Sequence, residues 1–288
     1  MATATTRRLG LSVDGADVLR YNDDGASHPR LSPRPYLHPL RTLAGTMVSD
    51  AFSPDHPHHL GLSMAVSDLD GINFWGGRTY TPDGSKWLPN HGRQVSMELG
   101  LQGRNISEML SWRSPDGTEV AVESRKVGAR SHPAPGCWAL SLTSTLQPAP
   151  DRGPITISSS GVKGRPGAGY GGIFWRFPRD ARVGIVQAGG LRGVQEVHGA
   201  RTPWLSLSVN VSGVPATVIL LQDIAHQRPW FVRTEGYIGA GPAAAWDSPL
   251  HVTGEHPLRQ SIRAVVCDGV VDSPELADFL AESIPSNL

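Results

Sequence analysis

The densest group of side chains able to carry out chemistry is a run of histidines. The string D-H-P-H-H-L-G-L begins at Asp55 and contains His56, His58 and His59, and His38 precedes it in R-P-Y-L-H-P-L. Imidazole transfers protons near neutral pH and ligates metals. We predict that His58 or His59 acts as a base or a metal ligand, oriented by His56 and Asp55. Each histidine alone could equally serve a structural role by hydrogen-bonding backbone carbonyls.

A second group combines amides, aromatic rings and an arginine. It reads G-I-N-F-W-G-G-R from Gly71 and is followed by N-H-G at 90–92, which places Asn73, Trp75 and His91 in it. Aromatic rings stack on the apolar faces of sugars while amides fix the hydroxyl groups. We therefore predict these three residues to bind a polyhydroxylated ligand, although Trp75 could also be a core residue, as we expect for Phe74.

Two further segments supply cationic and aromatic candidates. The glycine-rich stretch 161–176 contains Lys163, Tyr170 and Arg176, and Q-R-P-W-F-V-R contains Trp230 and Arg233. Lys163 and Arg176 are candidates to stabilise an oxyanion, and the other three to form a site wall. The alternative interpretations are structural. Lys163 and Arg176 could be solvated strand residues, and the pair Trp230 and Phe231 could belong to a small hydrophobic cluster.

Several well-marked enzyme classes lose support from the sequence. A literal G-x-G-x-x-G begins at Gly167, but a dinucleotide fingerprint must open a helix and the residues that follow alternate like a strand. We therefore expect no nucleotide cofactor. G-x-S-x-G, H-E-x-x-H and C-x-x-C are absent from the sequence. A divalent metal stays open, and His56, His58 and His59 would be its ligands.

The elements that must position these residues are mostly strands. The 33 glycines and 24 prolines fall between short runs that alternate apolar and polar side chains, which is typical of strands joined by tight turns. The clearest strands are predicted at 119–126, 138–146, 155–159, 205–211, 217–221 and 261–267. One helix is predicted at about 273–284, capped by Ser273, with Pro274 at its first position and an apolar stripe of Leu276, Phe279, Leu280 and Ile284.

This pattern predicts an all-β protein, a large antiparallel sandwich of two sheets with one C-terminal helix packed outside. All-β sandwiches of this length often form one domain, so we expect a single domain over 1–288. The stretch 27–92 is too irregular for an ordinary connection and is predicted to be a long functional loop. We expect one pocket to contain most of the following residues: His38, His56, His58, His59, Asn73, Trp75, His91, Lys163, Tyr170, Arg176, Trp230 and Arg233.

Composition limits the partners and the compartment. The 26 basic and 26 acidic residues balance, which argues against nucleic-acid binding. No window of about 18 apolar residues exists, and the N-terminus lacks the apolar region of a secretory signal, so we expect no membrane partner and a cytoplasmic location. Cys137 and Cys267 lie in apolar strands and are predicted to be buried free thiols, although proximity could allow a disulfide. A homo-oligomer is compatible with the sequence.

Six blocks, in order over about 33–280, carry a resemblance to a known family. They read R-P-Y-L-H-P-L, D-H-P-H-H-L-G-L, G-I-N-F-W-G-G, G-Y-G-G-I-F-W-R-F, P-W-F-V-R and L-R-Q-S-I-R-A-V-V-C-D-G. The chain resembles the bacterial family labelled "PmoA", whose name derives from a membrane-bound oxygenase subunit. It departs from that family before P-W-F-V-R, where 225–228 read A-H-Q-R instead of the common N-P-R. The H-P-H-H-L-G block is also similar to loops of aldose mutarotase-type supersandwiches.

The resemblance implies a β-sandwich protein of unestablished chemistry, often encoded near sugar dehydrogenases and isomerases. Together with the candidate residues, it leads us to expect a carbohydrate-active enzyme, a lyase, hydrolase or epimerase that acts on a sugar or keto-glycoside by acid–base chemistry. A non-enzymatic sugar-binding module and a metal-dependent oxidoreductase, as the family label suggests, are the alternatives.

Overall fold

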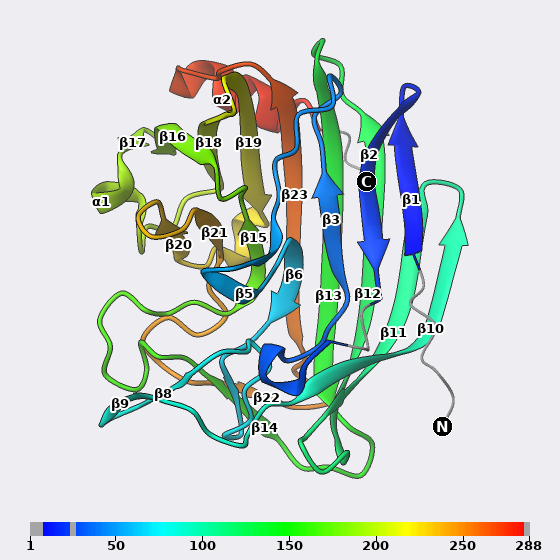
Figure 1. Cartoon of the computed structure of the whole chain (residues 1–288), viewed down its shortest axis with the longest axis vertical. Helices are drawn as coiled ribbons and strands as arrows, with labels where there is room; N and C mark the ends of the chain where they lie inside the picture. The colour runs from blue at the N-terminus through cyan, green and yellow to red at the C-terminus, as the bar shows by residue number, and fades with distance from the viewer. Residues whose placement is uncertain (1–7, 24–26, 285–288) are drawn as a thin grey trace.

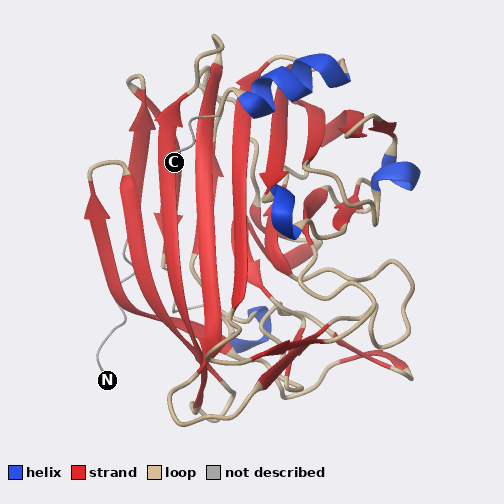
Figure 2. Cartoon of the chain, turned by 180° about the vertical axis from the view of Figure 1, so that it is seen from behind, coloured by secondary structure: helices blue, strands red, loops and turns tan. Residues whose placement is uncertain are grey.

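Two large antiparallel sheets form the body of the protein. The computed structural model describes residues 8–23 and 27–284, and Figures 1 and 2 show the two sheets from opposite sides. The seven-stranded sheet has the order β1 (Arg8–Val13), β2 (Ala16–Asn22), β3 (Tyr36–Leu40), β6 (Leu62–Ala65), β15 (Gly172–Arg176), β21 (Gly239–Pro242) and β20 (Trp230–Arg233). The predicted all-β sandwich is therefore confirmed.

The nine-stranded sheet faces the seven-stranded one. Its order is β10 (Arg93–Gln102), β11 (Asn105–Arg113), β12 (Glu119–Ser131), β13 (Cys137–Pro148), β23 (Leu258–Asp268), β19 (Val214–Gln222), β18 (Trp204–Val211), β16 (Ala181–Ala188) and β17 (Leu191–Arg192). Five of the six predicted strands lie within strands of the structure, and the sixth, 155–159, extends one residue past its strand. Five of them belong to this sheet, and the sixth is β14 (Ile155–Ser158), which pairs with β7 (Asp68–Leu69) and β22 (Leu250–Val252).

The stretch 27–92 differs from the predicted long loop. It supplies β3 and β6 to the seven-stranded sheet, and β7, the hairpin of β4 (Ala51–Ser53) with β5 (His56–Leu60), and the hairpin of β8 (Thr79–Thr81) with β9 (Gly84–Lys86). It also contains η1 (Pro29–Leu31), a single turn of 3-10 helix. These strands are short, and β3 and β5 also contain proline and histidine, so little alternation is visible in the sequence. The histidine run is therefore a strand and not a loop.

Alternation gives the seven-stranded sheet two distinct faces. Trp175 of β15 and Trp230 of β20 are fully buried in the core between the sheets. Their neighbours Phe174 and Phe231 point to the opposite face, where they join a separate cluster. Successive side chains of a strand alternate between faces. The outer face of this sheet is therefore lined with aromatic side chains.

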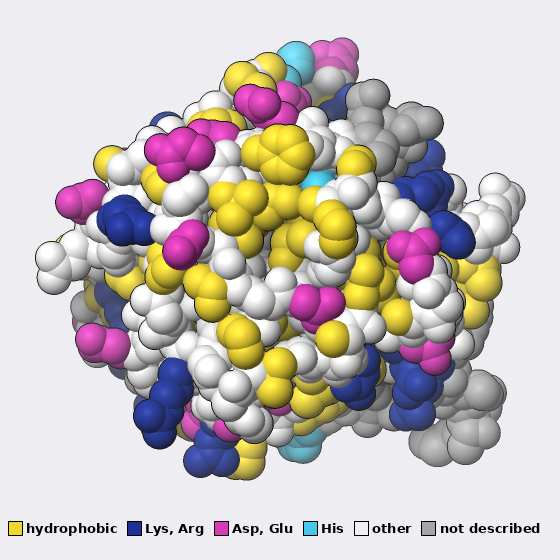
Figure 3. Space-filling model, turned by 90° about the horizontal axis from the view of Figure 1, so that it is seen from above, with side chains coloured by type: hydrophobic (Ala, Val, Ile, Leu, Met, Phe, Trp, Pro, Cys, Tyr) yellow, Lys and Arg dark blue, Asp and Glu magenta, His cyan; other side chains and the backbone are white. Residues whose placement is uncertain are grey.

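The C-terminal helix packs on the outer face of the nine-stranded sheet, as Figure 2 shows. It is α2 (Pro274–Glu282), and the Ser273 hydroxyl accepts a hydrogen bond from the Leu276 amide, so the predicted helix and cap are confirmed. The predicted apolar stripe is only half right. Leu280 and Ile284 are buried, but Leu276 and Phe279 are 40% and 58% exposed. Figure 3, which views this end of the molecule, shows hydrophobic side chains gathered on its surface.

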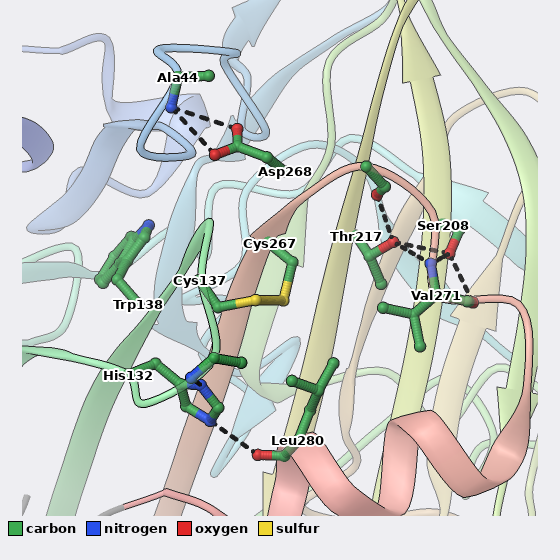
Figure 4. Close-up of a disulfide and its surroundings, with 12 residues drawn as sticks. Ala44, His132, Cys137, Trp138, Ser208, Thr217, Cys267, Asp268, Val271 and Leu280 are labelled. Atoms are coloured by element: carbon green, nitrogen blue, oxygen red, sulfur yellow. Dashed lines mark hydrogen bonds between the residues drawn. A yellow bond between two sulfur atoms is a disulfide. The ribbon is translucent and has the colours of Figure 1, made fainter.

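The prediction of two free thiols is wrong, because Cys137 and Cys267 form a disulfide beneath α2 (Figure 4). They are directly opposite each other on β13 and β23, with Cα atoms 4.2 Å apart, and both are buried as expected. Sequence alone does not reveal this register. A disulfide is at odds with a reducing compartment. No helix within the described ranges has the length and apolarity needed to cross a membrane.

A buried ionic network links the two sheets near β2. The Arg125 guanidinium on β12 donates hydrogen bonds of 2.8 Å to both carboxylate oxygens of Glu123, and others to the Gln94 amide oxygen and the Tyr21 hydroxyl. The Tyr21 hydroxyl in turn donates to the Glu108 carboxylate. All five side chains are buried. Buried charges are tolerated when they are paired and hydrogen-bonded, as these are.

The remaining helical segments are single turns. They are α1 (Val194–Val197), which follows β17, and η2 (Ile224–His226), which follows β19.

Candidate functional site

The base of the candidate site is an aromatic cluster on the outer face of the seven-stranded sheet. Phe174 and Phe231 supply it from β15 and β20, and Trp75 and Tyr237 cover them from loops. Tyr170 packs at the edge of this cluster, where the centroids of the Tyr170 and Trp75 rings are 4.9 Å apart. We call these five residues the outer aromatic cluster. They bring together three distant parts of the chain, around residues 75, 170–174 and 231–237.

The three histidines of β5 lie against this cluster. The rings of His56 and His59 stack with centroids 4.8 Å apart, and the rings of His58 and His59 are 4.5 Å apart. His59 also contacts Tyr237 at 4.6 Å and Trp75 at 5.5 Å. The hairpin of β4 and β5 therefore places the imidazoles of His56 and His59 on the outer aromatic cluster, with His58 packed beside them.

Arg34 and two glycines hold β5 in this position. The buried Arg34 guanidinium donates hydrogen bonds to the carbonyls of His58 and Trp75, at 2.8 and 3.1 Å, and so fixes both segments. The His58 side chain packs directly on Gly76 and Gly77, where an added Cβ would lie 2.7 and 2.8 Å from it. Both glycines also have positive φ angles, 93° and 72°. Only glycine allows this close approach with that backbone conformation.

A carboxylate, an imidazole and a guanidinium meet at the rim of the site. The His56 Nδ1 is 2.8 Å from an Asp55 carboxylate oxygen, and an Arg176 nitrogen is 3.3 Å from the same oxygen. Burial raises the pKa of the Asp55 carboxyl, but the His56 hydrogen bond and the Arg176 charge outweigh it and hold the pKa below its usual range. Asp55 is therefore ionised at neutral pH and orients the His56 ring.

The Arg176 guanidinium has donors to spare. The Arg176 side chain is 1% exposed, and its guanidinium carbon, Cζ, lies 5.1 Å from the centre of the Tyr237 ring. The Nε and Nη1 atoms are buried and have no hydrogen-bond partner among the described residues, and the same holds for Nδ1 of His59. A buried donor without a partner costs about 1–3 kcal/mol. A ligand oxygen bound here would recover that cost.

The other two histidines are held neutral. Burial, reinforced by the Arg34 charge, lowers the pKa of His58 to about 3. Burial and the neighbouring His58 lower the pKa of His59 well below its ordinary value. The His56 side chain is 32% exposed, whereas His59 is 2% exposed. A proton carrier must exchange with solvent and must take up a proton near neutral pH, so burial argues against His59 and the lowered pKa argues against His58, the two residues preferred from the sequence. His56, oriented by the Asp55 carboxylate, is the remaining candidate.

A cleft of about 840 Å³ opens beside the aromatic cluster, and its lining includes Tyr170, Phe231, Arg233 and His198. The Arg233 guanidinium lies over the Tyr237 ring at 4.8 Å, and the other side of the cluster holds His56, whose ring is 4.7 Å from Tyr237. The volume suits a mono- or disaccharide, since pockets for small molecules have about 300–1,000 Å³. None of the three β5 histidines is among the residues that line this cleft, and Tyr237 contacts both the cleft-lining Arg233 and His56.

Most of the predicted site residues meet around this point. His56, His58, His59, Trp75, Tyr170 and Arg176 are joined by ring or ionic contacts, and Arg233 is joined through Tyr237. The His91 Nε2 donates a hydrogen bond of 2.7 Å to the carbonyl of Gly77, the glycine against which the His58 ring packs. Lys163 pairs with Asp68 and lines, with Trp75 and Tyr170, a small cavity of about 10 Å³.

Three predicted residues have other roles in the structure. Trp230 is fully buried in the main core and donates through Nε1 to the Thr202 carbonyl. Asn73 is also buried, and its side chain accepts hydrogen bonds from the amides of Trp75 and Gly76, which shapes the turn. His38 on β3 hydrogen-bonds Ser49 at 2.9 Å, and burial lowers its pKa.

Sequence reasoning missed Tyr237, Phe231 and Arg34. In a strand, the alternation of W-F-V-R places Phe231 and Arg233 on one face and Trp230 on the other. Trp230 and Arg233 therefore cannot line the same side of the sheet. Arg34 stands beside the conspicuous P-Y-L-H-P-L string. Tyr237 follows a glycine in an unremarkable loop, so only the fold identifies it.

A metal site is not evident in the geometry. Among residues 8–23 and 27–284, no group of three or more histidine, cysteine, aspartate or glutamate side chains is arranged to hold a metal ion. His56, His58 and His59, named as ligands if a metal is present, instead pack through their ring faces and edges.

The neutral histidines predict a specific dependence of stability on pH. A folded-state pKa below the unfolded value of about 6.5 means that the unfolded chain takes up a proton first as the pH falls, so stability is lost below about pH 6.5. We expect the wild-type protein to lose about 1.5 kcal/mol through His58 alone between pH 6.5 and 5. Urea unfolding of wild type and His58→Gln at both pH values measures this. Parallel losses in the two proteins would contradict it, and the exposed His256 provides a matched control as His256→Gln.

Comparisons with known proteins give a family without an assigned chemistry. A family model described as "Family of unknown function (DUF6807)" matches residues 8–281, and its description carries no "PmoA" label. No curated protein sequence matches. Among solved structures, a "Putative aldose 1-epimerase" from Escherichia coli K12 aligns over 93% of this chain and 100% of its own, with 10% identity and a TM-score of 0.39.

Proposed function

This chain belongs to the DUF6807 family, a family of unknown function, and from its site we propose a carbohydrate-active enzyme. Its reaction moves a proton next to a carbonyl group of a sugar or keto-glycoside. One observation carries the proposal: a carboxylate-backed, partly exposed imidazole, His56, stands beside a buried arginine, Arg176, that has two unpartnered donors. A base next to a fixed cation is what proton abstraction beside a carbonyl requires.

In this reaction His56 removes the proton from the carbon next to the carbonyl. The electrons of the broken C–H bond form a C=C bond, and the carbonyl electrons move to oxygen, which becomes an enolate. Arg176 binds that oxyanion through Nε and Nη1, and Asp55 stabilises the imidazolium. Delivery of a different proton to the opposite face of the carbon by a second acid gives an epimer, with the proton on His56 later lost to solvent, and departure of a protonated oxygen from the next carbon gives an elimination product.

Tyr237 is suited to supply the second proton. Burial raises the pKa of its hydroxyl to about 12, against the opposing charge of Arg233, so the group is protonated at neutral pH. Its ring lies 4.7 Å from the His56 ring and under both arginines. A neutral phenol next to two guanidinium groups can donate to a leaving oxygen and share the charge that results.

The outer aromatic cluster supports a sugar as the substrate. Tyr170 and Phe231 contribute to the wall of the 840 Å³ cleft and present apolar ring surface there. Sugar rings stack on aromatic faces through their C–H groups, while charged side chains such as Arg233 bind hydroxyl or carboxylate oxygens.

Hydrogen exchange tests the proposal directly. The protein is incubated in D₂O with a panel of aldoses and keto-glycosides, and proton NMR follows the loss of the signal next to the carbonyl. We expect exchange or elimination with at least one of them, abolished in Arg176→Met. Saturable binding with no exchange across the panel would contradict the proposal and favour the sugar-binding module. A redox metal that copurifies and is needed for turnover would favour the oxidoreductase.

A further inference from the structure

We propose that a second cleft, beside Trp87, is a binding site for a sugar-sized organic anion. The cleft has a volume of about 610 Å³ and lies between η1, the segment 87–93 that leads into β10, and the turn at 114–115. Its lining contains none of the residues that carry the proposed proton transfer, Asp55, His56 or Arg176. The inference is therefore independent of the proposed function.

An exposed tryptophan marks this cleft. The Trp87 side chain is 48% exposed, and among the described residues it is the one tryptophan that stands among the exposed large hydrophobic side chains. Leu88 and prolines 29, 33, 89 and 115 extend the apolar surface around it. A solvent-exposed indole in a concave site walled by prolines is typical of a surface that binds a ligand ring.

The charged side chains that contact the Trp87 ring or line the cleft are basic. The guanidinium groups of Arg30 and Arg78 lie 5.0 and 5.7 Å from the centre of its ring, and Arg93 lines the same cleft. None of these three arginines forms an ion pair with a described carboxylate within 4.0 Å, and no acidic residue is among the cleft-lining residues. The nearest acid along the lining turn, Asp116, is engaged by the Ser114 hydroxyl and the Thr118 amide.

These two features together define the ligand. The uncompensated arginines bind a carboxylate or a phosphate, since guanidinium pairs with both in a bidentate manner. The tryptophan and the prolines take the apolar face of a compact ring. An acidic sugar and a sugar phosphate share this chemistry, a negative group on a polyol ring, and the volume suits either of them.

The site is held rigidly on one side. The backbone carbonyl of Arg30 accepts a hydrogen bond of 2.9 Å from the Gly77 amide, and the imidazole of His28 caps η1 by accepting from the Arg30 amide. The backbone position of Arg30 is therefore set before a ligand arrives, which lowers the entropy cost of binding.

Tryptophan fluorescence tests the inference, because Trp87 is accessible to solvent and other tryptophans such as Trp112 and Trp138 are fully buried. The intact protein is titrated with glucuronate, glucose 6-phosphate, glucose and inorganic phosphate. We expect a saturable change with at least one of the sugar anions and a much weaker response to glucose. Comparing glucuronate with glucose 6-phosphate tells which anionic group is preferred.

Variants separate a site from a general surface effect. Arg30→Ala and Arg93→Ala should each weaken binding by roughly tenfold, whereas Arg182→Ala, at an exposed position on β16, should not. Calorimetry with Trp87→Phe checks binding without the reporter. His56→Ala, which removes the proposed base outside this cleft, should bind the sugar anions with wild-type affinity. The binding test can therefore succeed even if the proposed function fails.

The inference is overturned by equal affinity for glucose and the sugar anions, by inorganic phosphate binding as tightly as the sugar anions, or by no saturation with any of them. Wild-type affinity in both Arg30→Ala and Arg93→Ala, with thermal melts showing that the variants fold, also overturns it.

Discussion

Replacing His56 with alanine is expected to lower turnover by about 10²–10⁴-fold, the range for loss of a general base. The residue is 32% exposed at its side chain, so its truncation leaves no large cavity, and Asp55 keeps Arg176 as a partner at 3.3 Å. The free energy of unfolding should therefore change little. The effect is measured as the rate of deuterium exchange into a substrate identified by the NMR screen. The rates of the variant and the wild type are compared at saturating substrate.

A matched control and a companion variant sharpen this test. His256→Ala removes an exposed histidine from a turn before β23 and should leave the exchange rate unchanged. Asp55→Asn keeps the shape but removes the charge that orients the ring, so it should lower the rate less than His56→Ala does. If His56→Ala exchanges at the wild-type rate while His58→Ala or His59→Ala does not, the assignment of the base is wrong.

Replacing Arg125 with alanine is expected to lower the free energy of unfolding by about 3–5 kcal/mol, the cost of removing one partner from a buried ion pair. The guanidinium is the buried cation that pairs with Glu123 and bonds Tyr21, and both are fully buried. Without it, Glu123 becomes an unpaired charge between the sheets. Urea unfolding at pH 7, monitored by tryptophan fluorescence, measures the loss.

Lys126 provides the control, because it is the next residue on β12 and points to solvent. Lys126→Ala should change the free energy of unfolding by less than about 0.5 kcal/mol. Replacing Arg125 and Glu123 together by apolar residues should cost less than Arg125→Ala, since no charge is then left unpaired. A loss below about 1 kcal/mol in Arg125→Ala would show that water reaches Glu123.

Strands and helix were predictable because their signals are local. The alternation in β12, β13, β18, β19 and β23 and the cap at Ser273 depend on neighbouring residues only, and each appears in the structure. The strands at 27–92 were missed because they are too short to show a clear alternation, and because proline and histidine interrupt β3 and β5. In β5 the sequence H-P-H-H-L presents no apolar alternation, although it pairs with β4.

The candidate site was predictable in its residue types and less so in its geometry. Histidine clustering identified the β5 residues, but the sequence could not show that His59 is buried whereas His56 and His58 are partly exposed. The surroundings of these rings include Arg34 and Tyr237, which approach from distant segments. The same limit applies to Cys137 and Cys267: their pairing depends on the register of β13 with β23, which lie 130 positions apart.

The place of β23 in the nine-stranded sheet has a consequence for how the chain is built during synthesis. This strand, residues 258–268, pairs with β13 on one side and β19 on the other, so it joins the four strands β10 to β13 to the four strands β16 to β19. A nascent chain that has emerged only to residue 250 therefore holds two half-sheets with two unpaired edges. Such edges recruit other chains. The nine-stranded sheet therefore closes only when β23 arrives, and until then the two half-sheets expose edges open to pairing with other chains.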